Sequence, residues 1–329
     1  MTVLKALRIF NEDGKVASRY VDMQLDELDA GSVVIKVAYS SVNFKDALAA
    51  TGAGRIIRRF PCVGGIDLSG TVTESADARF KKGDAVIATS YDIGVAHDGG
   101  YAQYARIPAD WVVPMPKGLD LFESMALGTA GFTAALAVER MEHDGLKPGN
   151  GPVIVTGATG GVGSIAIDIL AGAGYHVVAL TGKETETDYL KSLGAKEVML
   201  RGGLDLAKIK PLDKATWAGA VDNLGGDVLA WLASTMQIGG ALASIGLAAN
   251  HSLSTTVMPF ILRGVSLLGI DSVNAPMPLR EKVWKRLGSD LKPLHLKSIV
   301  TTVDFADLQG VFEKVMNAKM RGRAAVKIA

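Results

Sequence analysis

The sequence predicts an α/β protein in which a doubly wound parallel sheet is inserted into a mainly β domain. Three observations support this: short strands separated by turns at the start, alternating strands and helices in the middle, and a glycine-rich turn where the alternation begins. A length of 329 residues suits two domains, each with its own core. We assign residues 1–124 and 271–329 to the mainly β domain, and residues 125–270 to the inserted domain.

Apolar and β-branched runs bounded by glycine predict the strands of the first segment. They are Ala6 to Phe10, Ser32 to Ser40, Leu68 to Thr73, Asp84 to Ala88 and Gly100 to Ile107. A helix is predicted from Leu121 to Arg140, and a Pro-Gly-Asn-Gly cluster at 148–151 then breaks the chain.

Strands and helices alternate in the middle of the chain, which is typical of a parallel sheet covered on both faces. The predicted strands are Val153 to Thr156, His176 to Leu180, Glu197 to Leu200, Trp217 to Asn223, Ala241 to Ile245 and Ser266 to Ile270. Helices are expected at Gly163 to Ala173 and Glu186 to Leu193. The tail carries an amphipathic helix at Leu308 to Met316 and a last strand at Ala325 to Ile328, and we expect it to return to the first domain.

Composition excludes several classes of protein. The 35 basic and 34 acidic side chains nearly balance, so no overall field draws the chain to nucleic acid or to an anionic membrane. The only cysteine, Cys62, cannot form an internal disulfide, which fits a reducing compartment. The N-terminus does not resemble a secretory signal, and we expect a cytoplasmic protein that does not span a membrane.

The segment VIVTGATGGVGSIAID (153–168) carries the strongest functional signal. A β-rich run enters a turn with glycines at 157, 160, 161 and 163 and leaves as an apolar helix. Glycines allow the backbone to approach a pyrophosphate, and the helix N-terminus favours an anion. The position between a predicted strand and a predicted helix makes this a dinucleotide-binding turn rather than a chance glycine cluster.

The end of the second strand indicates which dinucleotide binds. Proteins specific for NAD usually carry an acidic residue there, which holds the ribose 2′-hydroxyl. This chain has Thr181, Gly182 and Lys183, and Arg201 follows the next strand. A hydroxyl and two cations suit a 2′-phosphate, so the sequence favours NADPH, although each cation can equally be an ordinary surface charge.

A zinc site needs three or four His, Cys or carboxylate ligands that converge on one point. One cysteine and five histidines without paired spacing argue against such a site, so we predict no metal.

Five blocks of sequence resemble one family, in that family's order: SSVNFKD (40–46), FPCVGGIDLSG (60–70), GTAGFT (128–133), TGATGGVG (156–163) and MPFILR (258–263). The chain resembles the quinone-oxidoreductase-like branch of the medium-chain dehydrogenases/reductases, and within it most closely the NADPH-dependent acrylyl-CoA reductases. The resemblance covers essentially the whole chain. It implies a GroES-like fold for the mainly β domain and a Rossmann fold for the inserted domain. Zinc-dependent relatives have a His-Glu pair where this chain has Ile66 and Asp67, so the resemblance implies the zinc-free branch.

The resemblance implies a reaction. Hydride passes from the nicotinamide to the β-carbon of acryloyl-CoA and a proton to the α-carbon, which gives propionyl-CoA. Because hydride addition makes an enolate, the site needs donors near the thioester oxygen. We expect Asn43 to serve as an amide donor, with Lys45 and Asp46 as orienting or proton-relay groups. An alternative remains open, in which Lys45 and Asp46 only cap a helix and Asn43 only forms a turn.

The resemblance also implies the residues that contact the cofactor: Phe44, Thr159, Gly160, Gly161, Val162, Thr181, Gly182, Lys183, Arg201, Leu247, Ile261 and Ser272. Gly157 joins them as the first glycine of the turn.

A basic cluster formed by Arg55, Arg58 and Arg59 is unusual in this nearly neutral chain. Coenzyme A carries phosphates, which arginine binds well, so these residues are candidates for the substrate handle. Arg321 and Arg323 form a second basic pair with the same possible role, and ordinary solvated charges are the alternative for both groups.

Two competing functions remain open. A quinone, enone or enal reductase would keep the fold and the cofactor, and an NADPH-binding redox sensor would lack turnover. Relatives in the family usually form homodimers through an edge of the nucleotide-binding sheet, and the apolar run Val265 to Ile270 suits such an edge.

Overall fold

The computed structural model describes residues 2–328, which divide into two compact units. The first unit holds the described parts of Met1–Thr129, Val273–Gly288 and Leu296–Ala329, and the second holds Ala130–Ser272 and Ser289–His295. The first boundary therefore follows residue 129 rather than residue 124, and it lies inside a helix, where no turn residues mark it in the sequence. The short segment Ser289–His295 joins the second unit, whereas the sequence analysis placed it in the first.

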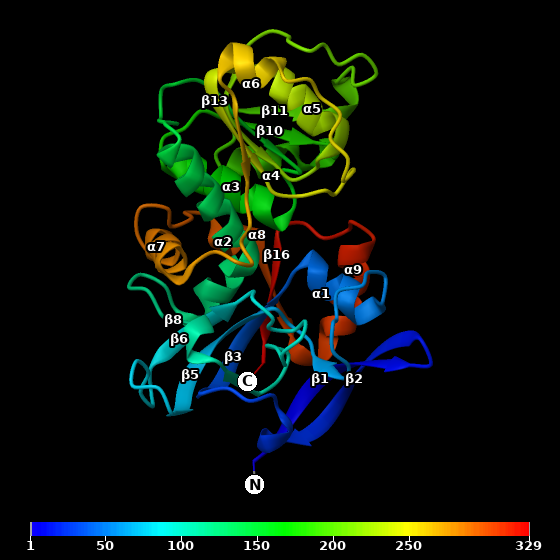
Figure 1. Ribbon diagram of the computed structural model, residues 1–329, viewed down its shortest axis with the longest axis vertical. Helices are drawn as coiled ribbons and strands as arrows, with labels where there is room; N and C mark the ends of the chain where they lie inside the picture. Colours follow the sequence, from blue (N-terminus) through cyan, green and yellow to red (C-terminus); the bar gives the residue numbers. More distant parts are fainter. Residues whose placement is uncertain (1, 329) are drawn as a thin grey trace. The chain divides into compact units, whose positions relative to one another are not determined.

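The second unit is built on a six-stranded parallel sheet with the order β11-β10-β9-β12-β13-β14. Its strands are β9 (Val153–Thr156), β10 (Val177–Thr181), β11 (Glu197–Leu200), β12 (Trp217–Asp222), β13 (Met236–Ser244) and β14 (Ser266–Gly269). Its helices are α3 (Gly161–Gly172), α4 (Thr187–Ser192), α5 (Gly226–Thr235) and α6 (Met258–Arg263). Helix α3 packs against β9 and β10, and α5 packs against β12 and β13 (Figure 1). The predicted doubly wound sheet is confirmed, and the order reverses between β9 and β12.

The first unit contains a seven-stranded sheet and a three-stranded sheet. The large sheet has the order β15-β16-β3-β5-β6-β8, with β7 also paired to β3, and the small one has the order β2-β1-β4. Its strands are β1 (Val3–Glu12), β2 (Lys15–Gln24), β3 (Val33–Val42), β4 (Cys62–Val63), β5 (Asp67–Ser75), β6 (Ala85–Thr89), β7 (Tyr104–Ile107), β8 (Val112–Pro114), β15 (Val300–Asp304) and β16 (Arg323–Lys327). Its helices are α1 (Phe44–Thr51), α7 (Met277–Leu287), α8 (Leu296–Ile299) and α9 (Leu308–Met316).

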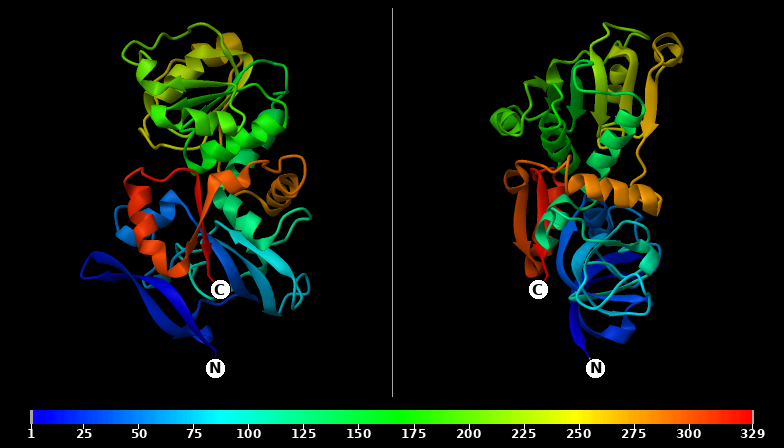
Figure 2. Two further views of the ribbon diagram at one scale, coloured as in Figure 1. Left: turned by 180° about the vertical axis from the view of Figure 1, so that it is seen from behind. Right: turned by 90° about the vertical axis from the view of Figure 1, so that its left-hand side faces the viewer.

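The tail of the chain returns to this first unit. Strand β16, red in Figure 2, pairs antiparallel with β3, and Ala324 faces Val42 in the register. Helix α9 packs against α1, so residues from the two ends of the chain share one core.

The hairpin of β1 and β2 was not predicted, although the sequence contains its signal. Asp13 and Gly14 form a two-residue connection, and both have positive φ angles, 52° and 84°. An Asp-Gly pair with this geometry is a favoured hairpin turn. Strand β2 was missed because its sequence, KVASRYVDMQ, has little apolar alternation and only Met23 is fully buried.

Helix α2 (Leu121–His143) is bent at Gly128, where φ is 52° and ψ is −156°. In the described chain it is the one helix long and apolar enough to cross a membrane, and 78% of its most apolar window is buried inside the protein. The buried helices at the core of a globular protein pass the same test, so length and composition here are weak evidence for a membrane span.

Candidate active site and nucleotide-binding turn

A tight turn joins β9 to α3 at the glycine-rich segment. Gly157 has a φ of 57°, a left-handed conformation that glycine adopts readily. A Cβ on Gly163 would lie 2.4 Å from the Gly157 carbonyl oxygen, so only glycine lets the helix start this close to the strand. The N–H of Ser164 donates to the Gly160 carbonyl at 2.9 Å, and the amides before it have no partner within the helix. Of the other cofactor contacts predicted here, Thr159 lies in the turn, and Gly161 and Val162 are the first two residues of α3. This local geometry suits an anion.

Polar side chains hold β9 and β12 together where the strand order reverses. The Thr156 hydroxyl donates to Asp222 Oδ1 at 2.7 Å and accepts the Asn223 N–H at 2.9 Å. The Asn223 amide nitrogen donates to the Thr156 carbonyl at 2.8 Å. Burial raises the pKa of Asp222, and the hydrogen bonds it accepts oppose that rise. These residues were not predicted from the sequence, although an Asp-Asn pair at the end of an apolar strand marks the crevice of an open α/β sheet.

The end of β10 gathers hydroxyl and cationic groups. The Thr181 hydroxyl accepts the N–H of Lys183 at 3.0 Å, which shapes the turn after the strand. The Arg201 guanidinium lies beside Gly182, because a Cβ on Gly182 would be 3.6 Å from its Nη2. Residues from the ends of two neighbouring strands are thus brought together, in the pattern that a 2′-phosphate would require.

The other residues expected at the cofactor are dispersed. Leu247 follows β13 and is 66% exposed, and Ile261 on α6 is 70% exposed. Ser272 is the last residue before the chain returns to the first unit. Phe44 belongs to the first unit, where it is the first residue of α1 and 57% exposed.

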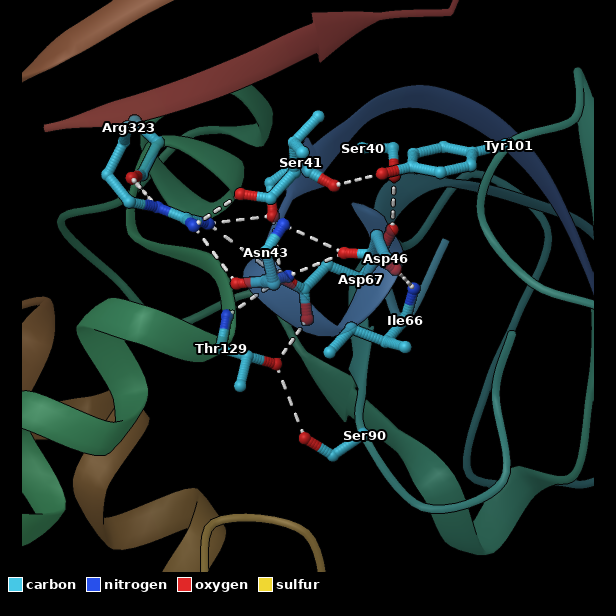
Figure 3. A network of polar contacts seen from close by, with 12 residues as sticks. Ser40, Ser41, Asn43, Asp46, Ile66, Asp67, Ser90, Tyr101, Thr129 and Arg323 are labelled. Carbon is cyan, nitrogen blue, oxygen red and sulfur yellow. Dashed lines mark hydrogen bonds and ion pairs between the residues drawn. The ribbon is translucent and has the colours of Figure 1, made fainter. Parts of the chain in front are cut away.

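A buried polar network surrounds the start of α1 in the first unit (Figure 3). Asn43 is the N-cap of α1, and Asp46 Oδ2 accepts both its backbone N–H, at 2.8 Å, and its amide Nδ2, at 3.1 Å. Asp46 Oδ1 accepts the N–H of Ile66 at 3.0 Å. Asp46 is only 2% exposed, so it caps the helix from inside the domain.

Asp67 stands at the centre of this network. Its Oδ2 accepts the Ser41 hydroxyl at 2.6 Å, the Asn43 amide at 2.8 Å and the Thr129 N–H at 2.8 Å. Its Oδ1 accepts the Thr129 hydroxyl at 2.5 Å. Arg323 supplies the positive charge, with its Nη2 at 3.8 Å from Asp67 Oδ2.

These contacts change the role expected of Asn43. Its two amide N–H bonds are directed at the carboxylates of Asp46 and Asp67, and its Oδ1 accepts Arg323 Nη1 at 3.0 Å. No N–H of the side chain is left for a thioester oxygen. The donor role predicted for Asn43 therefore does not fit this geometry. The purely structural alternative fits better, although Asn43 is the N-cap of α1 rather than only a turn residue.

Gly128 makes room for the network at the bend of α2. A Cβ there would lie 2.4 Å from Arg323 Nη2 and 2.6 Å from both Asp67 Oδ2 and the Ser41 hydroxyl. The bend also exposes the Thr129 N–H, which donates to Asp67. The network therefore depends on a glycine that brings α2 into contact with three polar groups.

The charges of the network do not balance. Burial first, and the nearby Asp67 charge second, raise the pKa of Asp46 to about 7. Burial lowers the pKa of Arg323 and raises that of Tyr101, whose hydroxyl donates to the Ser41 carbonyl at 3.0 Å. Two carboxylates and one guanidinium carry an excess negative charge when both acids are ionised, so the network gains by binding one proton.

Stability should therefore fall as the pH rises from about 4 to about 7. In this window the folded protein keeps a proton in the network around Asp46 that the unfolded chain has lost, which corresponds to a slope of about 1.4 kcal/mol per pH unit. In the Asp46→Asn variant we expect this slope of the free energy of unfolding against pH to be absent, whatever the variant's stability at any single pH. Denaturant titrations across that range measure the difference, and equal slopes in the two proteins would contradict the raised pKa.

The structure places the remaining catalytic and substrate candidates outside the network. Within the described chain, Lys45 makes none of these contacts. Arg58 pairs with Asp92, and Arg59 pairs with Asp29 and lies 3.6 Å from Asp98. Because carboxylates of the same chain already pair with these two arginines, the prediction that they bind a phosphate of coenzyme A is less favoured.

The two other arginine candidates have opposite surroundings. Arg55 is exposed, and no hydrogen bond or ion pair engages it among residues 2–328. Arg323 is 3% exposed and belongs to the buried network, so it is no surface ligand for phosphate.

No three His, Cys, Asp or Glu side chains converge to hold a metal ion in the described part of the chain. Asp67, which follows Ile66 at the place of the His-Glu pair in zinc enzymes, interacts with Arg323 instead.

Comparison with known proteins places the chain in a family. Residues 29–117 match the alcohol dehydrogenase GroES-like domain, and residues 161–288 match the zinc-binding dehydrogenase family. YhfP of Bacillus subtilis (strain 168), provisionally named a quinone oxidoreductase, is 48% identical over 99% of this chain and 99% of its own. The acrylyl-CoA reductase AcuI of Ruegeria pomeroyi is 45% identical over 96% of both chains.

Solved structures agree with these relatives. The yhdH oxidoreductase from Salmonella enterica in complex with NADP has a TM-score of 0.96 at 44% identity, covering 99% of this chain and 100% of that chain. The structure of Bacillus subtilis yhfP with NAD bound has a TM-score of 0.97 at 48% identity, and the match covers 99% of this chain and 100% of that chain. The chain belongs to the quinone-oxidoreductase-like branch of the medium-chain dehydrogenase/reductase superfamily, the branch that also contains its acrylyl-CoA reductase relatives.

Proposed function

We propose that this protein is an NADPH-dependent reductase of α,β-unsaturated thioesters that converts acryloyl-CoA to propionyl-CoA. The name of AcuI, at 45% identity, supports the reaction, and the NADP-bound yhdH structure, at 44% identity, supports the cofactor. The observation in this chain that carries the cofactor choice is the end of β10, where Lys183 follows Gly182 and the Arg201 guanidinium lies beside it.

Each unit has its own part in the proposed reaction. In the second unit, the glycine turn and the N-terminus of α3 bind the pyrophosphate, and Thr181, Lys183 and Arg201 bind the 2′-phosphate. When bound, the reduced nicotinamide supplies the hydride that adds to the β-carbon of the substrate. In the first unit, Phe44 offers an exposed ring for apolar contact with the cofactor, Lys45 orients the substrate, and Arg55 binds a phosphate of coenzyme A.

The Lys183→Ala variant should raise the KM for NADPH by about 10- to 100-fold, because it removes a charge-assisted hydrogen bond to phosphate. The KM for NADH should stay within about twofold, because NADH lacks that phosphate. Lys191→Ala is the matched control, since Lys191 is an exposed lysine on the neighbouring helix α4. Steady-state kinetics with both nucleotides test this. An equal change for the two nucleotides would remove Lys183 from the 2′-phosphate site.

The substrate is tested by following NADPH absorbance after treatment with a chelator. Acryloyl-CoA, crotonyl-CoA, free acrylate and a small quinone are offered in parallel at one concentration. We expect fast oxidation with acryloyl-CoA and at least about tenfold slower oxidation with free acrylate, since the acid lacks the coenzyme A handle. Preferred reduction of the quinone would overturn the thioester assignment.

A quinone reductase is the second candidate, and one observation favours it: YhfP, at 48% identity, carries that provisional name. If the protein is a quinone reductase, the assay above should show turnover of the quinone, and coenzyme A should not change the rate of that turnover. An NADPH-binding redox sensor predicts binding of NADPH without turnover of any of the four compounds.

We also propose that the protein forms a homodimer through β14, the edge strand of the six-stranded sheet. Leu267 on this strand is 39% exposed, and apolar side chains are also exposed on the preceding helix α6 and its N-cap, with Leu262 59% and Val257 65% accessible. A second copy of the chain would cover these side chains, and its own β14 would pair with the open edge of the sheet. Sedimentation equilibrium tests this, and a monomer at micromolar concentration would contradict it.

A further inference from the structure

The two oxygens of the central carboxylate, Asp67, have different surroundings. Three N–H or O–H donors converge on Oδ2, from Ser41, Asn43 and Thr129, and Arg323 lies near the same atom. In the described chain, Oδ1 has a single hydrogen-bond partner, the hydroxyl of Thr129 at 2.5 Å. A backbone N–H, an amide or a guanidinium can only donate here, whereas a hydroxyl can also accept. A proton on Asp67 can therefore be accepted by the Thr129 hydroxyl at Oδ1 or by the Ser41 hydroxyl at Oδ2, and of these two hydroxyls only that of Thr129 belongs to a partly exposed residue.

The network is also built to take up one proton. Asp46 and Asp67 are bridged by the Asn43 amide nitrogen, 3.1 Å from one carboxylate and 2.8 Å from the other. Arg323 is the only cation that interacts with either carboxylate in the described chain, and Tyr101 is a neutral neighbour with a raised pKa. Because both carboxylates are buried, the excess negative charge favours the uptake of one proton by the network.

Thr129 is the member of the network through which this proton can leave. Asp46 and Asp67 are 2% and 0% exposed, and Ser41 and Arg323 are also buried. Asn43 and Thr129 are partly exposed, but both N–H bonds of the Asn43 amide are taken. The Thr129 hydroxyl also lies 3.3 Å from the hydroxyl of Ser90, so it already adjoins a second group that can exchange a proton.

We propose that Thr129 is the proton donor to the α-carbon and that Asp67 reloads it. This inference rests on the proposed reductase function. The Thr129 O–H bond breaks as the α-carbon of the enolate forms a C–H bond. The Thr129 oxygen takes the proton from Asp67 Oδ1, which becomes a carboxylate, and solvent water returns a proton to the carboxylate pair. The hydride and its two electrons come from NADPH, so the sum is addition of one hydride and one proton across the double bond.

The roles of the neighbours follow from the same geometry. Asp46 adds a second buried negative charge, which favours the uptake of a proton by the network. The Asn43 amide donates to Oδ2 of Asp67, and Arg323 lies 3.8 Å from the same oxygen, so Oδ1 is left facing Thr129. These three are positioning residues, and Thr129 is the member of the network that touches the substrate.

Thr129→Val tests the proposal, with Thr129→Ser as the matched control. Valine keeps the shape of the side chain and the backbone N–H that donates to Asp67, but it lacks the hydroxyl. We expect Thr129→Val to lower kcat on acryloyl-CoA by about 10²- to 10⁴-fold, the usual contribution of a general acid, with the Kd for NADPH unchanged. The wild type should lose kcat as the pH rises through about 7, where Asp46 titrates. Thr129→Ser should keep this pH limb, and Thr129→Val should lose it.

A second readout needs no substrate. Infrared difference spectra across the same pH range should show the carbonyl band of a protonated carboxyl in the wild type. In Thr129→Val the band should shift in frequency, because the acid proton has lost its acceptor. An unshifted band, or wild-type kcat and pH profile in Thr129→Val, would overturn the proposal. If the wild type reduces no thioester, the proposed function fails, and the infrared measurement still decides whether Asp67 and Thr129 share a proton.

Discussion

Replacing Arg323 with methionine should lower the free energy of unfolding by about 3–5 kcal/mol, the range for removing one partner of a buried ion pair. Arg323 is 3% exposed and donates to the Val42 carbonyl at 2.8 Å, the Ser41 hydroxyl at 2.8 Å and the Asn43 amide oxygen at 3.0 Å. Its loss leaves two buried carboxylates without a cation and several acceptors without a donor. This decrease in the free energy of unfolding should be smaller near pH 5, where protonation removes negative charge from the network, than near pH 8.

Lys327→Met is the matched control, because Lys327 lies on the same strand, β16, with its side chain exposed. It should change stability by less than about 0.5 kcal/mol. Urea titrations at both pH values measure these differences. If Arg323→Met destabilises the protein no more than the control does, the guanidinium does not neutralise the network.

Gly163→Ala should abolish most NADPH binding. The new Cβ would lie 2.4 Å from the Gly157 carbonyl oxygen and 2.8 Å from the Ala158 Cα, and both are backbone atoms that cannot rotate away. Helix α3 must then move off the turn, which costs about 1–3 kcal/mol of stability and displaces the amides that face the pyrophosphate. We expect the Kd for NADPH to rise by more than about tenfold, as measured by fluorescence titration.

Gly172→Ala makes the same change at the other end of α3. There the nearest atoms to the new Cβ belong to the Leu294 side chain, at 3.8 Å and 3.9 Å, which is ordinary contact. We expect unchanged NADPH affinity. The free energy of unfolding should rise by about 0.5–1 kcal/mol, because alanine favours the helix more than glycine does. Equal affinity in both variants would show that the close approach at Gly163 is not needed for binding.

The fold of the second unit could be predicted because its signals are local. Each strand is a short apolar run, and the glycine turn lies between one such run and a helix, so β9, β11 and α3 were located to within two residues. The hairpin at Asp13 and Gly14 was predictable from the same kind of signal but was missed, because β2 lacks a clear apolar face.

The buried network could not be predicted, because its parts are far apart in the sequence. Ser41, Asp67, Thr129 and Arg323 come from β3, β5, the bend of α2 and β16, and only the folded sheet brings them together. The role of Asn43 was ambiguous for a related reason. An Asn three residues before an Asp fits both a helix cap and a catalytic pair, and the partners that decide between them, Asp67 and Arg323, are not local.

The positions of isotopes in the product show whether hydride and proton add to acryloyl-CoA as proposed. Acryloyl-CoA is reduced with NADPH deuterated at the nicotinamide C4, and separately with ordinary NADPH in deuterated water, and the product is analysed by NMR. The account predicts propionyl-CoA with deuterium on the β-carbon in the first reaction and on the α-carbon in the second. Deuterium from the nicotinamide at any other position, or oxidation of NADPH without propionyl-CoA, would contradict it.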